Sequence, residues 1–262
     1  MNTHPHGLLL LLATLPLGCV GTTGGELFEL SASAAGPERE ASGSLRFENS
    51  LGYAIELDEA RLFVGGLYLN RSRPTSVSSD TSCSLPGIYV AEVLGGREID
   101  LLSPEPQAFP RPGFATTDPA STAEIWLHEG DVNRTASERP VLRVSGTAQR
   151  AGDSYPFYGQ LSIGENRVVP PTDAALPGQY PICKQRIVSP VPVELRPAPG
   201  RALMLRVDPR PMFGNVDFAT MTAVDGAFEL ADASGVNQAS DNLYAGLRRS
   251  TGVYELSWTE ER

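Results

Sequence analysis

The chain has 262 residues, with 31 Asp and Glu against 21 Lys and Arg, which gives a formal net charge of −10 at pH 7. We expect no nucleic-acid partner, because a phosphate-binding surface needs clustered Lys and Arg, and the cationic residues are scattered here. The length is enough for one sizeable β domain or two small ones.

Residues 1–18 predict a signal peptide. The run from Leu8 to Val20 carries no charge and is shorter than the roughly 20 apolar residues that span a bilayer, which favours a removable export segment. Its end, LPLGC at 15–19, resembles the lipobox of bacterial lipoprotein precursors. This resemblance implies a lipid on Cys19, the membrane as a partner, and a cell-envelope location, anchored in the outer membrane and facing the periplasm or the exterior. The alternative is a plain secretory signal followed by a chance cysteine.

The cysteine count agrees with a lipidated Cys19. The chain has three cysteines, and if Cys19 carries lipid, then Cys83 and Cys183 are left as an even pair. Their disulfide would close a loop of about 100 residues, for which the chain-entropy model gives about 4.7 kcal/mol. The alternative is two buried free thiols. A zinc site is disfavoured, since neither cysteine has a C-x-x-C partner or a nearby His.

The mature chain divides into a tether and a folded part. Residues 19–42 are rich in Gly, Thr, Ser and Ala, so we expect a flexible tether in which only 26–30 can pair as a short strand. Residues 43–262 are expected to form a single β-sandwich-like domain.

Alternation of apolar and polar residues predicts strands along this domain. The Gly65-Gly66 pair indicates a bulge or bend, and Gly95-Gly96 predicts a hairpin turn. Residues 103–122, with five prolines, and 169–181 are expected to be loops. The strand candidates are 44–49, 54–57, 60–69, 87–94, 97–102, 123–128, 141–149, 155–163, 186–188, 193–196, 202–207 and 253–258.

A single clear helix is predicted near the end, with Ser240 as its cap, Leu243, Tyr244 and Leu247 at helical spacing, and Gly252 beyond its end. A shorter helical turn is expected within 213–222. About ten strands with one short C-terminal helix predict an all-β fold, an antiparallel β-sandwich or a distorted barrel.

The sequence contains neither the G-x-S-x-G motif of serine hydrolases nor the H-E-x-x-H motif of zinc proteases. No catalytic residue is therefore assigned. Oxygen and imidazole ligands gather in two places: Glu124, His128, Glu129 and Asp131, and the loop that Asp232 and Asp241 flank. Such groups can bind Ca²⁺, and the alternative is that they are solvated acidic loops. No cofactor is predicted apart from this possible Ca²⁺.

Three segments, GSLRFENSLGYAIELDEARLFVGGLYLNRS, PGIYVAEVLGGREIDLLS and GVYELSW, resemble those of uncharacterised envelope lipoproteins of myxobacterial type. The resemblance implies an envelope location and an all-β fold, and no activity or site residue comes with it. We therefore expect a lipid-anchored, non-catalytic binding or interaction module that contacts a ligand, an envelope protein or a polymer through loops such as 103–122. The alternatives are a carboxylate-based hydrolase, in which Glu124, Glu129 and Asp131 would converge, and a metal-binding (Ca or Cu) accessory protein.

Overall fold

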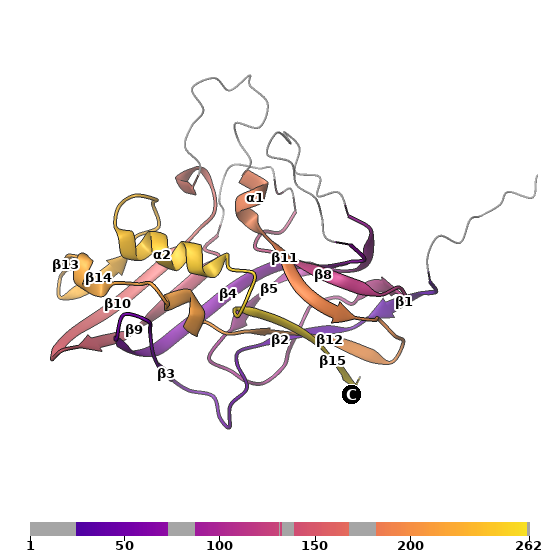
Figure 1. The fold of residues 1–262 in the computed structure, drawn as a ribbon, viewed down its shortest axis with the longest axis horizontal. Helices are drawn as coiled ribbons and strands as arrows, with labels where there is room; N and C mark the ends of the chain where they lie inside the picture. The colour runs from indigo at the N-terminus through magenta and orange to yellow at the C-terminus, as the bar shows by residue number, and fades with distance from the viewer. Residues whose placement is uncertain (1–24, 73–86, 131, 133–138, 168–181, 261–262) are drawn as a thin grey trace, which may run out of the picture.

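The computed structural model describes residues 25–72, 87–130, 132, 139–167 and 182–260. Within them the chain forms two stacked sheets, as the all-β prediction requires (Figure 1). The sandwich alternative is confirmed, because both sheets keep free edges and do not close into a barrel. Two strand pairs, β10 with β14 and β12 with β2, are parallel, and the other pairs in the described residues are antiparallel.

The larger sheet has eleven strands. Its main path, in spatial order, is β1 (Leu27–Leu30), β7 (Gly113–Thr116), β5 (Tyr89–Asp100), β4 (Ala54–Asn70), β9 (Leu142–Arg150), β10 (Asp153–Leu161), β14 (Ala227–Leu230) and β13 (Ala223–Val224). Three more strands branch from it: β3 (Leu45–Glu48), β8 (Ala120–Trp126) and β11 (Ile187–Leu195).

The smaller sheet has four strands, in the order β15 (Tyr254–Glu260), β12 (Arg201–Val207), β2 (Ala32–Ala35) and β6 (Gln107–Ala108). The helical elements are η1 (Glu165–Arg167), α1 (Ile182–Arg186), η2 (Arg210–Phe213), η3 (Phe218–Thr220) and α2 (Gln238–Leu247). No helix in these ranges is long and apolar enough to cross a bilayer.

Strand β4 organises the larger sheet. One of its edges pairs with β5, and the other pairs first with β9 and then, from Gly66 onward, with β8. The change of neighbour coincides with a register shift between Val64 and Gly66. A Cβ on Gly65 would lie 1.9 Å from the carbonyl oxygen of His128, so only glycine fits where the strands diverge. The predicted bulge at this glycine pair is confirmed.

The predicted hairpin at Gly95-Gly96 is wrong. Strand β5 runs through both glycines, with Leu94 opposite Gly66 and Arg97 opposite Val64, so the pair forms a bulge instead of a turn. A long antiparallel partner outweighs the local turn preference here, since β5 continues to pair with β4 on both sides of the bulge. Gly95 has a φ of 91°, which glycine adopts without strain.

Residues 103–122 are not a continuous loop, because β6, β7 and the start of β8 lie within them. The five prolines fall outside these strands, so none of them removes a ladder donor. The turn between β9 and β10, at Ala151 and Gly152, lies in the gap between the strand candidates 141–149 and 155–163, and both residues have positive φ. The expected loop at 169–181 lies outside the described residues.

The expected tether does not extend over Leu27–Ala35. Strand β1 pairs with β7, and β2 pairs with β12 through small side chains, of which Ala32, Ala34 and Ala35 are buried. Alanine contributes little apolar area, but its small side chain allows β2 to lie close to the larger sheet. This packing outweighs the flexible composition of the segment. The short strand expected at 26–30 is present.

Helix α2 begins one turn earlier than predicted. Asn237 is its cap, and its side chain accepts a hydrogen bond from the Ser240 amide at 2.7 Å. Leu243 and Leu247 point inward and are fully buried, as their helical spacing predicted. The expected turn within 213–222 contains η3 and the end of η2.

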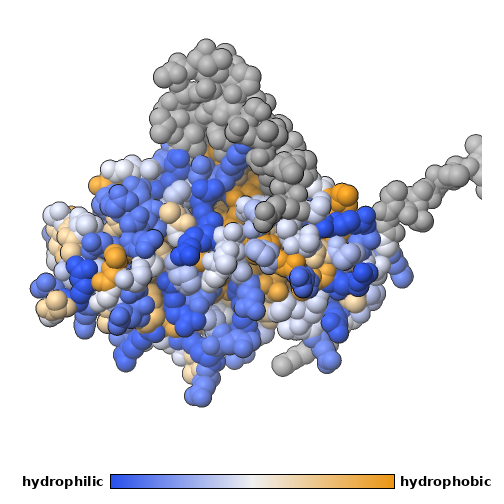
Figure 2. Space-filling view, viewed as in Figure 1, coloured by the Kyte–Doolittle hydropathy of each residue, from blue (hydrophilic) through white to orange (hydrophobic). Residues whose placement is uncertain are grey.

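Hydrophilic residues cover most of the face of the molecule that Figure 2 shows.

Candidate functional site

One row of side chains crosses the outer face of the larger sheet. In antiparallel register, Glu29 of β1 lies opposite Phe114 of β7, Phe114 opposite Glu92 of β5, Glu92 opposite Tyr68 of β4, and Tyr68 opposite Glu124 of β8. Acidic and aromatic residues therefore alternate over five adjacent strands. We call these five residues the acid-aromatic ladder.

The period of two along each strand places the ladder on the outer face. The residues next to each ladder position point into the core, as Leu67 and Leu69 do around Tyr68, and Ala123 and Ile125 around Glu124. Directly opposite residues in neighbouring strands are close enough to interact, so the ladder is one continuous strip of contacts.

Exposure falls along the ladder from β1 to β8. Glu29 and Glu92 are exposed, Phe114 is 54% exposed, Tyr68 is half-buried, and Glu124 is fully buried. Neither the Glu29 nor the Glu92 carboxylate makes a hydrogen bond or ion pair with any residue that the structure describes. Two carboxylates and one aromatic ring at this end are thus open to a partner.

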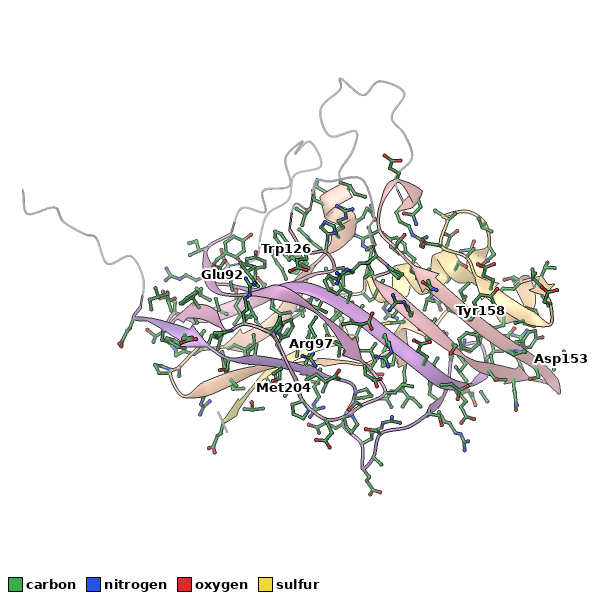
Figure 3. All side chains as sticks on the ribbon, turned by 180° about the vertical axis from the view of Figure 1, so that it is seen from behind. Glu92, Arg97, Trp126, Asp153, Tyr158 and Met204 are labelled. Atoms are coloured by element: carbon green, nitrogen blue, oxygen red, sulfur yellow. The ribbon has the colours of Figure 1, made fainter. Side chains whose placement is uncertain are left out.

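Aromatic rings gather at the other end of the ladder. The ring of Tyr68 lies 4.7 Å from that of Trp126 and 5.1 Å from that of Tyr89, centre to centre. Tyr89 itself is 41% exposed, and Leu94, on the other side of Glu92 along β5, is 47% exposed. Figure 3 shows Trp126 and Glu92 near one another, on the two strands that flank β4, with Tyr158 and Asp153 at the opposite end of the molecule.

The buried carboxylate of Glu124 is held by two neutral donors. Asn70 donates its side-chain amide to Oε1 at 3.1 Å, and Trp126 donates its indole N–H to Oε2 at 3.1 Å. Burial raises the pKa of Glu124 above its usual value, and the two hydrogen bonds oppose this shift only in part. The Oδ1 atom of Asn70 is also buried and accepts no hydrogen bond in the described structure. This end of the ladder is therefore rich in acceptors.

The neighbouring phenols report the same electrostatic environment. The pKa of Tyr68 is raised by burial and then by the charges of Glu92 and Glu124. The pKa of Tyr89 is raised to about 12 by burial and then by Glu124 and Tyr68. The burial part of these shifts disfavours a charge of either sign, and the smaller part that comes from Glu92 and Glu124 reflects the negative charge of this face.

The first predicted ligand group is divided by the structure. Glu124 belongs to the ladder, whereas His128 and Glu129 line a small cavity of about 110 Å³ together with Phe63 and Arg139. The guanidinium of Arg139 lies 4.3 Å from the centre of the Phe63 ring. Asp131 lies outside the described residues. The convergence of Glu124 with Glu129 that a carboxylate hydrolase would require is not observed.

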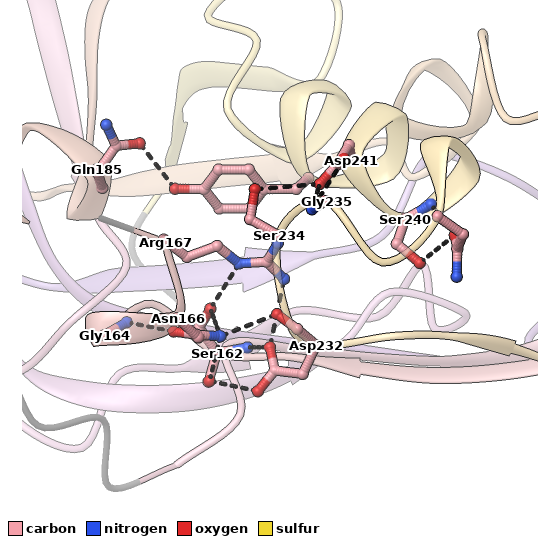
Figure 4. Close-up of polar contacts among 12 residues, drawn as sticks. Ser162, Gly164, Asn166, Arg167, Gln185, Asp232, Ser234, Gly235, Ser240 and Asp241 are labelled. Atoms are coloured by element: carbon pink, nitrogen blue, oxygen red, sulfur yellow. Dashed lines mark hydrogen bonds and ion pairs between the residues drawn. The ribbon is translucent and has the colours of Figure 1, made fainter. Parts of the chain in front are cut away.

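The second predicted group, Asp232 and Asp241, serves local structure (Figure 4). Asp232 accepts hydrogen bonds from the amide and the hydroxyl of Ser162, both at 2.5 Å. It also forms an ion pair with Arg167 at 3.3 Å. Asp241 instead accepts from the Gly235 amide at 3.1 Å. Each carboxylate thus ties a different loop. No group of three or more His, Cys, Asp or Glu side chains in the described ranges is arranged to hold a metal ion.

The predicted cysteine roles are only partly covered by the described residues. Cys183 is buried at the start of α1 and is disulfide-bonded. Cys83 and Cys19 lie outside those residues, so the Cys83 to Cys183 pairing and the lipidation of Cys19 stay predictions.

Two open grooves, of about 530 and 820 Å³, lie on the outer face of the smaller sheet and share Glu38 and Arg206. Arg206 donates to the carbonyl oxygens of Gly36 and Pro104 and forms an ion pair with Glu38. Its charge therefore fastens two chain segments to the sheet.

Four ladder residues were missed from the sequence: Glu29, Tyr68, Glu92 and Phe114. In the strand candidate 123–128, the alternation of side chains puts Glu124 and Trp126 on one strand face, but the other four come from strands far apart in the chain. The signal that could have found them is an exposed aromatic or acidic residue at an outward position of each strand. The order of the strands in the sheet was needed to bring these positions into one row.

No protein-family model and no curated protein matches this chain. Among solved structures, MbnP from Methylosinus trichosporium is similar at a TM-score of 0.40 and 12% sequence identity, covering 89% of this chain and 99% of that chain.

Proposed function

We propose that this chain is a lipid-anchored envelope protein that acts as a non-catalytic binding module and holds a cationic partner on the acid-aromatic ladder. The observation that carries the proposal is the cross-strand row in which three glutamates alternate with two aromatic rings. The envelope location rests on the LPLGC leader at 15–19.

The ladder suits a cation for two physical reasons. Its exposed carboxylates, Glu29 and Glu92, lack partners among the described residues, so a basic group can approach them without breaking an ion pair. The aromatic faces beside them attract cations through the ring quadrupole, by about 0.5 to 1 kcal/mol at an exposed site. Aromatic residues are also the side chains that most often anchor binding interfaces.

The shape of the face favours binding over catalysis. Catalysis by paired carboxylates needs an acid and a base that converge on one bond. Here the only fully buried ladder carboxylate, Glu124, is engaged by Asn70 and Trp126, and the exposed ones lie two strands apart on a sheet surface. Such a surface recognises a partner by complementary charge and by contact area.

The experiment is a binding titration with labelled tetra-arginine, followed by fluorescence anisotropy. We expect saturable binding that weakens as salt is added, because exposed charges are screened over about 10 Å at 0.1 M ionic strength. Tetra-glutamate should not bind. Glu92→Gln should weaken tetra-arginine binding by about threefold to fivefold, in line with the loss of one exposed ion pair.

Glu229→Gln provides the matched control, because Glu229 is an exposed acid on β14, outside the ladder. It removes the same charge and should leave the affinity nearly unchanged. Equal loss of affinity in the two variants, or no binding of tetra-arginine to the wild type, would contradict the proposed site.

A further inference from the structure

The spacing of the exposed ladder carboxylates defines the partner more closely than the charge of the ladder alone. Glu29 and Glu92 both lie opposite Phe114, on the strands at either side of it. Neighbouring strands are about 4.8 Å apart, so the two carboxylates project from points separated by about 9.6 Å. Between them stands a phenyl ring that is 54% exposed.

A polyproline II segment repeats at nearly this distance. It has three residues per turn and rises about 3.1 Å per residue, so every third side chain lies on one side at intervals of about 9.3 Å. A basic residue at every third position would therefore meet Glu29 and Glu92 in succession. The residues between would contact Phe114, and aromatic surfaces are the usual receptors for polyproline II ligands.

The apolar surroundings of the two carboxylates fit the same ligand. Leu27 is 67% exposed beside Glu29 on β1, and Tyr89 and Leu94, which flank Glu92 on β5, are 41% and 47% exposed. Leu27 and Tyr89 lie on one side of the row that Glu29, Phe114 and Glu92 form, and Leu94 lies on the other side, so proline rings can pack on apolar surface beside the row. An isolated ammonium or guanidinium compound would leave most of this apolar surface uncovered.

We propose that the partner is an extended polypeptide segment of polyproline II form, with Lys or Arg at every third residue, lying across β1, β7 and β5. This inference rests on the proposed function, because it names the class of partner for the same face. It assigns ion pairing to Glu29 and Glu92, and proline contact to Phe114 and Tyr89.

Two labelled peptides of identical composition test the spacing. One repeats Arg-Pro-Pro four times, and the other carries its four arginines together with prolines on both sides. Both have capped ends and the same net charge, so only the spacing of the arginines differs. We expect the repeating peptide to bind about threefold to fivefold more tightly, which corresponds to the gain of a second simultaneous contact of exposed-pair strength.

Variants separate the contributions of the two surfaces. Phe114→Ala should weaken the binding of both peptides, because both lose the ring, but it should weaken the repeating peptide more, so that most of the preference for that peptide is lost. Tyr158→Ala is the matched control, since Tyr158 is a 44% exposed aromatic residue on β10, away from the ladder. It should leave the preference intact. Thermal unfolding of each variant confirms that the fold is retained.

The outcomes distinguish this inference from the proposed function. Equal affinities for the two peptides would overturn the polyproline II spacing and leave the cationic ladder standing. A preference that survives Phe114→Ala and Glu92→Gln together would place the spacing-selective site elsewhere and overturn the inference. If neither peptide binds the wild type, both the inference and the proposed function fail.

Discussion

Trp126 donates its indole N–H to Glu124 at 3.1 Å, from two residues further along the same strand. The contact turns the edge of the indole ring toward the carboxylate and leaves the ring against Tyr68, at 4.7 Å between centres. One short stretch of β8 therefore supplies both the buried acid and an aromatic wall. The cross-strand register then joins this pair to residues from four other strands.

The first prediction concerns the pH dependence of stability. The pKa of Glu124 is raised in the folded protein above its usual value of 4.5. Its contribution to stability is therefore fully present below pH 4.5 and is lost as the pH rises through the folded pKa. Glu124→Gln removes this titration. The free energy of unfolding of the variant, relative to that of the wild type, should therefore increase as the pH rises. Urea denaturation over a series of pH values measures the difference, and a difference that does not vary with pH would contradict the assignment.

The second prediction concerns the phenol of Tyr89, whose pKa is raised to about 12 by burial and by the charge of Glu124. Removing that charge in Glu124→Gln makes the phenolate less unfavourable, so the pKa of Tyr89 should fall. An NMR titration with ring-labelled tyrosine, assigned through Tyr89→Phe, gives the value. Glu229→Gln, which removes a charge from β14, is the control and should leave the pKa of Tyr89 unchanged. A Tyr89 pKa that is the same in the wild type and in Glu124→Gln would mean that the two groups do not interact.

The third prediction tests the divergence of β8 and β9 along β4. Gly65→Ala should destabilise the protein by about 2 kcal/mol or more, because the added methyl would meet the His128 backbone at 1.9 Å. Gly214→Ala is the control, since its new methyl would meet its nearest neighbour at 3.4 Å and its φ is −49°. That change should cost under about 1 kcal/mol. Similar denaturation midpoints for the two variants would argue against the close backbone approach at Gly65.

The fourth prediction concerns the anchor. Intact-mass analysis of the membrane fraction from the native host should find Cys19 as the first residue, carrying lipid, and the remaining two cysteines oxidised. Cys19→Ser should release the protein from that fraction. Recovery of a wild-type soluble form cleaved at another residue would reduce the proposal to ordinary secretion.

Local patterns predicted the elements whose partners are close in the chain. The β9–β10 pair, with its turn at Ala151 and Gly152, and the inward leucines of α2 are examples. The glycine pair at 95–96 gave the opposite result, because a hairpin turn and a bulge require the same residues and only the presence of the long partner strand β4 distinguishes them. A choice that depends on a distant partner is not encoded in the turn residues themselves.

The same limit explains the candidate site. Alternation placed Glu124 and Trp126 together on one face of a strand, and this placement is confirmed. The neighbour of that face, Tyr68, comes from a strand more than fifty residues earlier, and Glu29 lies in a stretch whose composition indicated a tether. Only the register across β1, β7, β5, β4 and β8 converts these separate residues into a row.

The most direct test of a cation-binding ladder is a comparison of two charge reversals. One variant combines Glu29→Lys with Glu92→Lys, and the other combines Glu48→Lys with Glu229→Lys, two exposed acids on β3 and β14. Both variants change the net charge equally, so any long-range attraction of a basic ligand is matched. Titration with labelled tetra-arginine should show binding lost in the ladder variant and largely retained in the other. Equal loss in the two variants would mean that net charge attracts the ligand and that the ladder is not its site.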